Sequence, residues 1–99
     1  MIVEPKEDVV MERHLSEEIV LQCEMSRSNG QVRWFKDGLK VVEDDNVRLT
    51  SEGPYRRLTV ASAAAKDSGE YVCDTDGDSV FFQLTVSGRK EGMGGRRDE

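Results

Sequence analysis

Apolar and polar residues alternate along the chain in short runs that are separated by glycine, aspartate and proline. In residues 18–25, the apolar side chains of Ile19, Leu21, Cys23 and Met25 occupy every second position. Because successive side chains of a β-strand point to opposite faces, this period of two predicts a strand with one face in a core. No segment keeps a helical period over three turns. The pattern therefore predicts an all-β fold.

Further short runs rich in β-branched and aromatic residues follow at the spacing typical of β-proteins. They predict strands at residues 31–36, 47–51, 57–61, 69–74 and 80–86. The segments between them favour tight turns and include Asp37-Gly38, Glu52-Gly53-Pro54 and the Asp-Gly pair within residues 75–78. Strand parity places Leu58 and Leu84 on the inward faces of their strands.

The N-terminal segment differs from the others because Pro5 interrupts it. Proline has no backbone N–H and cannot donate to a sheet, so it belongs on an edge strand or at a break in one. We therefore expect a split first strand, at residues 3–6 and 9–12. The whole chain would then form about eight or nine short strands in two sheets.

The length and composition allow one domain with a modest core, because the chain has 99 residues, of which 34% are charged and 36% hydrophobic. No run approaches the ~20 apolar residues that cross a bilayer. The first ten residues carry charges where a signal peptide needs an apolar run, so we expect no secretion signal. Residues 1–87 hold 10 basic and 17 acidic side chains, a net charge of −7. This acidic body disfavours nucleic acid and anionic membranes as partners.

A spaced set of residues then indicates a family. Trp34 lies eleven positions after Cys23, and Cys73 ends the run Asp67-Ser68-Gly69-Glu70-Tyr71-Val72-Cys73. This looks like the Cys, Trp and Asp-x-Gly-x-Tyr-x-Cys framework of immunoglobulin domains. The two cysteines are 50 positions apart and Lys40 to Val47 leaves no room for an extra strand pair, which resembles the intermediate set.

Residues 32–38 and 74–82 resemble the repeated immunoglobulin domains of obscurin and its obscurin-like relative, and the intermediate set as a whole is also found in titin. The resemblance covers residues 1–87 and implies an immunoglobulin-like, two-sheet, antiparallel Greek-key sandwich of the intermediate set. We expect residues 88–99, which are rich in glycine and charge, to be a flexible tail or inter-domain linker.

The resemblance also implies structural roles for the framework residues. Trp34 would fill the space between the sheets beside Cys23 and Cys73, and the Tyr71 hydroxyl would bond a nearby main-chain group. Asp67 would pair with Arg48 at the base of the sandwich, as the pattern of the family suggests. The predicted core residues are Cys23, Trp34, Leu58, Tyr71, Cys73 and Leu84.

The function implied by the resemblance is non-catalytic. Such domains are protein-binding and scaffold modules of the cytoplasmic cytoskeleton, above all of the sarcomere, with titin or myomesin-like immunoglobulin domains among the partners. An ectodomain module of an adhesion protein or receptor, and a passive spacer, are the alternatives. The two cysteines are compatible with a location inside or outside the cell. Outside the cell a disulfide between them would stabilise the fold by about 4 kcal/mol, whereas in the cytosol both thiols would stay reduced.

Catalytic and metal-binding patterns are weak. His14 is the only histidine, and no nucleophile is placed with it. Asp74, Asp76 and Asp78 have the spacing of a calcium loop, but that loop needs a glycine and a glutamate where Ser79 and Thr85 stand. Two cysteines and one histidine fall short of a four-ligand zinc site. We therefore expect no catalytic residues, no cofactor, no metal and no small-molecule substrate.

Strand parity gives one candidate protein-binding surface. If Trp34 and Tyr71 point inward, then Phe35, Val72 and Phe81 point outward on three neighbouring strands and form an apolar stripe. The rival site is an open sheet edge, either the split first strand or the last strand, which could accept a strand from a partner.

Overall fold

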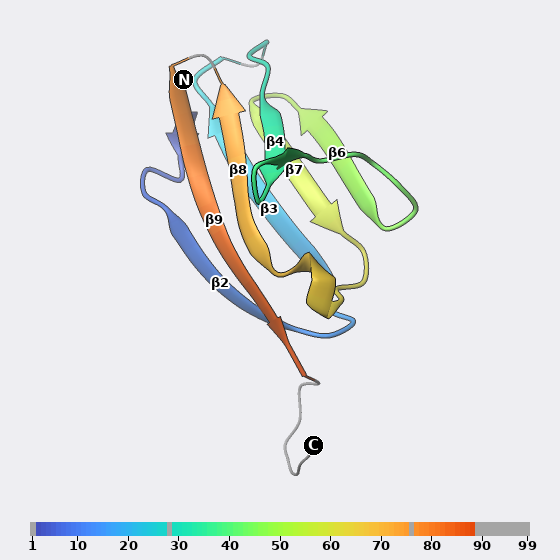
Figure 1. Ribbon diagram of the computed structural model, residues 1–99. Coiled ribbons are helices and arrows are strands. Elements are labelled where there is room, and N and C mark those ends of the chain that lie inside the picture. Colours follow the sequence, from blue (N-terminus) through green and yellow to red (C-terminus); the bar gives the residue numbers. More distant parts are fainter. Residues whose placement is uncertain (1, 28, 76, 89–99) are drawn as a thin grey trace.

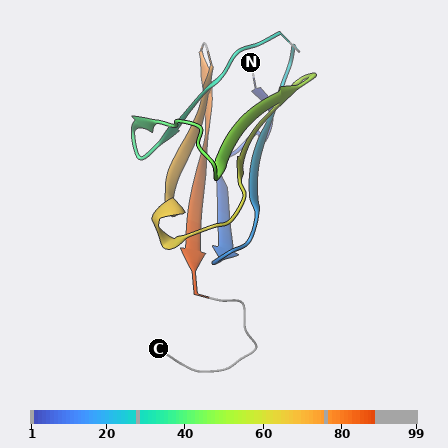
Figure 2. The same cartoon turned by 90° about the vertical axis from the view of Figure 1, so that its right-hand side faces the viewer.

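The computed structural model describes residues 2–27, 29–75 and 77–88, which form nine strands and one short 3-10 helix. The strands are β1 (Ile2–Glu4), β2 (Val9–His14), β3 (Ile19–Met25), β4 (Arg33–Lys36), β5 (Leu39–Lys40), β6 (Val47–Glu52), β7 (Tyr55–Val60), β8 (Gly69–Thr75) and β9 (Asp78–Ser87). The helix η1 (Ala65–Asp67) precedes β8. A four-stranded sheet of order β1-β3-β7-β6 packs on a five-stranded sheet of order β2-β9-β8-β4-β5 (Figures 1 and 2). The predicted two-sheet sandwich is confirmed.

The split first strand joins the two sheets. After β1 pairs with β3, the chain passes Pro5 and crosses to the other sheet, where β2 lies beside β9. The pair β2–β9 is parallel, and both arrows point the same way in Figure 2. This parallel pair is the exception in the otherwise antiparallel sandwich that the sequence predicted. The second half of the split strand extends to His14, two residues beyond its predicted end.

The core forms because alternate residues of facing strands meet between the sheets. In β3 the burial pattern follows the predicted period of two. Trp34 is 4% exposed, and its ring lies 5.8 Å from the ring of Phe82, centroid to centroid. All six predicted core residues are buried, namely Cys23, Trp34, Leu58, Tyr71, Cys73 and Leu84. Inward side chains of both sheets therefore form one closely packed core.

The turns use the residues that the sequence indicates. Asp37 and Gly38, between β4 and β5, have φ angles of 51° and 84°. Gly53 opens the β6–β7 turn with a φ of 57°, which glycine adopts without steric cost. Gly77 has a φ of 75° between Thr75 and Asp78, which pair across the β8–β9 hairpin. The predicted turn positions are confirmed, whereas the two-residue strand β5 was not expected.

The framework at the base of the sandwich differs in part from the expectation. The Tyr71 hydroxyl donates to the backbone carbonyl of Asp67 at 2.6 Å, so the expected main-chain bond is present. The expected ion pair between Arg48 and Asp67 is absent among the described residues. Arg48 alternates with the inward-packed Val47 and Leu49 and so faces solvent. The Asp67 carboxylate instead accepts the N–H of Ala64 at 2.8 Å.

The two cysteines are buried thiols that face each other across the core. A hydrogen bond with Cys23, followed by burial, raises the pKa of the Cys73 thiol above its ordinary value. A raised pKa suppresses the thiolate, which is the reactive form. These thiols therefore act as small apolar groups of the core.

Candidate protein-binding surface

Phe35, Val72 and Phe81 form one continuous row on the outer face of the five-stranded sheet. Phe35 lies opposite Val72 on β8, and Val72 lies opposite Phe81 on β9. Phe81 is 37% exposed, while Phe35 and Val72 are half-buried. The sequence placed these residues on three adjacent strands, and the structure brings them into direct register. We call this set the outer row.

Charged groups stand at the two ends of the outer row. Lys40 of β5 lies opposite Phe35 at one end. At the other end, the N–H of Phe81 donates to Asp8 Oδ1 at 3.3 Å. An apolar strip with charged ends suits a protein partner, since the ends can set the orientation while the strip excludes water.

Charged and polar pairs also flank the outer row along the strands. On one side an exposed ion pair joins Arg33 to Asp74 at 3.2 Å. On the other side Glu70 lies opposite Gln83. The apolar strip is therefore one residue wide along each strand, and any partner must meet polar groups on both sides of it.

The last strand, β9, does not lie at the edge of its sheet, so the prediction that it could offer an open edge to a partner is wrong. β9 lies between β2 and β8, so the free edges of the five-stranded sheet are β2 and β5. On β2 the Arg13 guanidinium donates to the Glu12 carbonyl at 2.7 Å. The His14 N–H donates to Glu17 Oε1 at 2.7 Å. Side chains of this chain therefore occupy part of the edge that a partner strand would need.

The β6 edge of the other sheet is occupied in a similar way. The N–H of Val47 donates to Asp44 Oδ1, and the N–H of Leu49 donates to Glu43 Oε2, each at 2.9 Å. Side-chain carboxylates thus take the place of a neighbouring strand along the first half of β6. Because long edges are partly occupied on both sheets, the outer row is the better candidate for a binding surface.

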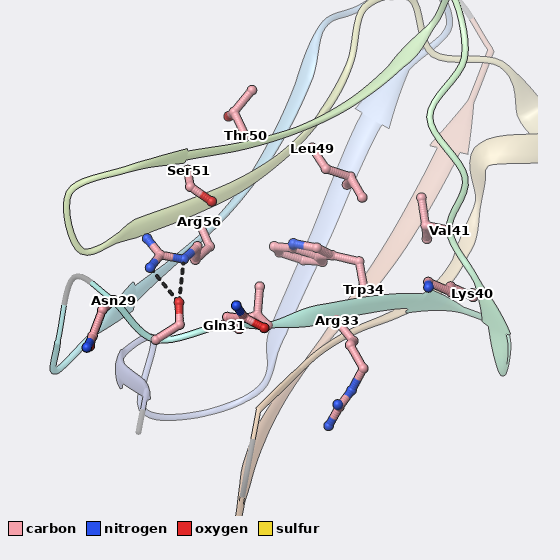
Figure 3. Close-up of a pocket in the computed structure, with 12 residues that line it drawn as sticks. Asn29, Gln31, Arg33, Trp34, Lys40, Val41, Leu49, Thr50, Ser51 and Arg56 are labelled. Atoms are coloured by element: carbon pink, nitrogen blue, oxygen red, sulfur yellow. Dashed lines mark hydrogen bonds between the residues drawn. The ribbon is translucent and has the colours of Figure 1, made fainter.

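A pocket of about 450 Å³ opens between the edges of the two sheets (Figure 3). Its apolar lining comes from Val32, Trp34, Val41 and Leu49, and the indole of Trp34 lies in the middle of the group. Its remaining lining residues are polar, basic or glycine, namely Asn29, Gly30, Gln31, Arg33, Lys40, Thr50, Ser51 and Arg56. The strand pattern of the sequence did not predict this pocket, because the pocket depends on how far apart the edges of the two sheets lie.

Arg56 holds one wall of the pocket in place. It is 5% exposed, and its guanidinium donates to the carbonyls of Gly30 at 2.5 and 3.1 Å, Gly53 at 2.7 Å and Tyr55 at 3.0 Å. These bonds tie the loop before β4 to the turn between β6 and β7. The sequence analysis did not predict a structural role for Arg56. Arg56 and the inward residue Leu58 are two positions apart in one strand, and this spacing could have indicated that Arg56 also points inward.

The residues considered for catalysis and metals are engaged elsewhere. His14 Nδ1 lies 3.6 Å from Glu17 Oε1. Asp78 accepts the N–H of Ile2 at 2.9 Å, while Asp74 pairs with Arg33. Asp76 and residues 89–99 of the expected tail lie outside the described residues.

The described part of the chain holds neither a metal-binding cluster nor a helix that could span a bilayer. No group of three or more His, Cys, Asp or Glu side chains is placed to hold a metal ion. Within the same residues, no helix has the length and apolar character needed to span a bilayer.

Comparisons with known proteins agree with this geometry. The family model of the immunoglobulin I-set domain matches residues 2–78. Titin of Drosophila melanogaster is 32% identical over 85 residues, which are 86% of this chain and 0% of that protein after rounding. Human slow-type myosin-binding protein C is 37% identical over 73 residues, which are 74% of this chain and 6% of that protein. The chain thus spans a very small share of these relatives.

Solved structures are similar over most of the chain. The immunoglobulin-like domain 714–804 of human obscurin-like protein 1 has a TM-score of 0.85 and 37% identity, covering 96% of this chain and 91% of that one. Domain 805–892 of the same protein has a TM-score of 0.82 and 40% identity, covering 87% of this chain and 96% of that one.

Proposed function

Because the chain belongs to the immunoglobulin I-set family, we propose that it is a non-catalytic protein-binding module of a large modular protein of the muscle cytoskeleton. Its likeness to titin, myosin-binding protein C and obscurin-like protein 1 supports this assignment. The structural observation behind it is the outer row, in which Phe35, Val72 and Phe81 are aligned across three strands. The rigid sandwich presents this row as a preformed surface.

The partner meets the outer row with apolar side chains of its own. Burying a partly exposed aromatic ring such as Phe81 removes apolar surface from water, which is favourable by about 25 cal/mol for each Å² before the costs of association are subtracted. Lys40 and Asp8, at opposite ends of the row, set the direction in which the partner lies. Binding of this kind needs no cofactor, metal or substrate.

The proposed partners are other proteins of the same assembly. By resemblance they are immunoglobulin domains of titin or of myomesin, and the proposed location is the cytoplasm at the sarcomere. The name of one relative states that it binds myosin, so myosin is a further candidate. The net charge of −7 on residues 1–87 argues against nucleic acid and anionic membranes.

The test measures binding to purified immunoglobulin domains of titin and myomesin and to myosin fragments by calorimetry. We expect Phe35→Ala and Phe81→Ala to lower the affinity at least about tenfold, as for aromatic hot spots. Val20→Ala is the matched control, because Val20 is 42% exposed on the other sheet. Unchanged affinity in folded Phe35 and Phe81 variants would reject the outer row, and binding to none of the probes would favour a passive spacer.

The proximity of the two cysteines is also compatible with the alternative function, an ectodomain module. Cys23 and Cys73 are close enough for a side-chain hydrogen bond, so the fold would also accommodate the pair in an extracellular module. A thiol assay on protein isolated without reductant from its own cell type separates the two locations. Two free thiols support the cytoplasmic module, whereas a complete disulfide supports an ectodomain.

A further inference from the structure

The apolar strip on the outer face of the five-stranded sheet runs across the strands. The outer row crosses β4, β8 and β9, which lie side by side (Figure 1). Val10 of β2 is 78% exposed and lies opposite Gln83, so it continues the strip diagonally beyond Phe81. Polar and charged residues lie on both sides of the row along each strand. A partner that covers the strip must therefore be long across the strands and narrow along them.

The spacing of the strip matches the side chains of an α-helix. Neighbouring strands are about 4.8 Å apart, so the backbone positions of Phe35 and Phe81, two strands apart, are separated by about 9.6 Å. In a helix, residues i and i+7 of one face are about 10.5 Å apart, and residue i+3 or i+4 falls between them. A partner strand laid along the row would present a side chain only every ~6.8 Å, which fits three adjacent strands less well.

The two sides of the outer row differ in charge. On one side, the exposed ion pair of Arg33 and Asp74 has no net charge. On the other side, the exposed carboxylate of Glu70 forms no ion pair within the part of the chain that the structure describes. Glu12 of β2 adds a second exposed carboxylate on the same side. A partner with lysine or arginine facing Glu70 is therefore complementary in charge.

The two ends of the outer row favour one direction for a bound helix. Lys40 lies opposite Phe35 at the β5 end, and Asp8 accepts the N–H of Phe81 at the β2 end. A helix carries a partial positive charge at its N-terminus and a partial negative charge at its C-terminus. The N-terminus of the helix is therefore favoured near Asp8, and its C-terminus near Lys40.

We propose that the outer row binds an amphipathic helix of a partner protein, whose apolar side chains contact the row and whose basic flank faces Glu70. The inference rests on the proposed protein-binding function and names the kind of structure that occupies its site. Among the proposed partners it favours helical segments over immunoglobulin domains, because those are sandwiches of β-strands.

The probe is a blocked alanine-based peptide of about 18 residues, long enough to form a helix in water. Leucines spaced three and four residues apart form one face, and arginines lie along one flank. One matched peptide carries glutamates in place of the arginines, and another has the same composition with the leucines scattered around the helix. We expect the first peptide to give saturable amide NMR shifts on β4, β8 and β9 of the full chain, with an affinity that falls as salt is added.

The matched peptides should bind at least about threefold more weakly, the size expected for exposed charge pairs. A spin label at the N-terminus of the first peptide should broaden the signals near Asp8, and a label at its C-terminus should broaden those near Lys40. Equal broadening at both ends of the row would contradict the proposed direction.

Three variants make the test specific. Phe81→Ala should lower the affinity for the first peptide about tenfold or more. Glu70→Lys should weaken the arginine peptide about threefold and strengthen the glutamate peptide. Glu18→Lys makes the same change of charge at an exposed position just before β3, on the other sheet, and should alter neither affinity. If Glu70→Lys fails to fold, Glu70→Gln provides the same comparison with a smaller effect.

The proposal would be overturned by equal binding of the scattered peptide, by shifts centred outside the outer face, or by no saturable shift up to about 1 mM peptide. The titin and myomesin domains test the proposed function separately. If they bind through Phe35 and Phe81 while the helical peptide does not, the protein-binding function stands and the helical partner is rejected. If neither binds, both proposals fail.

Discussion

The carboxylate of Asp37 occupies the space that a side chain on Gly69 would need. A Cβ atom built on Gly69 would lie 2.6 and 2.8 Å from the two carboxylate oxygens of Asp37. The same carboxylate accepts the N–H of Glu70 at 3.0 Å, and the Asp37 N–H donates to the Glu70 carbonyl at 2.8 Å. The turn after β4 is thus bonded to the start of β8, and glycine leaves the room for it.

We expect Gly69→Ala to destabilise the fold by about 1–3 kcal/mol, because the φ of 149° and the contact with Asp37 are both unfavourable for alanine. Urea unfolding measures the loss. Gly88→Ala is the control, since an added Cβ there meets nothing within 4 Å. In the double variant with Asp37→Ala, the total loss of stability should be smaller than the sum of the two single losses. If the two losses add exactly, the contact between Gly69 and Asp37 is unimportant.

The pH dependence of stability should report on Asp37. The bond from the Glu70 N–H, and then the bond from Lys36, lower the pKa of the Asp37 carboxyl below 3.8. A lowered pKa in the folded state stabilises the fold above the unfolded pKa, and this contribution is lost as the pH falls through the folded pKa.

The comparison is with Asp37→Asn, because asparagine tolerates the positive φ of this position. The wild type should be more stable than the variant above about pH 5, and the difference should shrink below about pH 4. Urea unfolding across this range gives the two curves. A difference that stays constant down to acid pH would show that the charge of Asp37 does not matter.

Arg56 and Arg57 form a natural comparison, since they are neighbours on opposite faces of β7. Arg56→Met should cost about 2–4 kcal/mol, because the buried guanidinium loses its hydrogen bonds to the carbonyls of Gly30 and Gly53. Arg57→Met should cost about 0.5 kcal/mol or less, since its ion pair with Glu52 is largely exposed. Thermal unfolding of both variants measures the difference, and equal losses would contradict the proposed role of Arg56.

The cysteine thiols should resist labelling in the folded protein. Both are buried, and the raised pKa of Cys73 further reduces its thiolate. We expect a thiol reagent to label neither cysteine before unfolding and to label both at once in urea. Rapid labelling of native protein would mean that the core opens far more easily than its packing suggests.

Most of the fold could be predicted from the sequence because strand parity and turn residues act locally. Ile19 and Leu21 alternate with polar neighbours, and Gly53 and Gly77 stand where positive φ angles are needed. The same parity predicted that Phe35 and Phe81 face outward. These features depend on nearest neighbours in the chain, and so they can be read from one sequence.

Features that depend on distant segments could not be predicted in this way. The parallel pairing of β2 with β9 results from where the chain crosses between sheets. The pocket at Trp34 depends on the separation of two sheet edges, and the hydrogen bonds of Arg56 depend on two loops that meet in space. The predicted pair of Arg48 with Asp67 was wrong because parity turns Arg48 outward.

The parallel pair of β2 and β9 has a mechanical consequence. The register runs from Val9 beside Phe82 to His14 beside Ser87, so tension on the chain before β2 and after β9 pulls the two strands in opposite directions along their length. Single-molecule stretching should show a lower unfolding force for Met11→Pro, which removes one bond in the middle of this pair. In such shear geometry the remaining bonds resist together, whereas a hairpin pulled from its open end releases them one at a time.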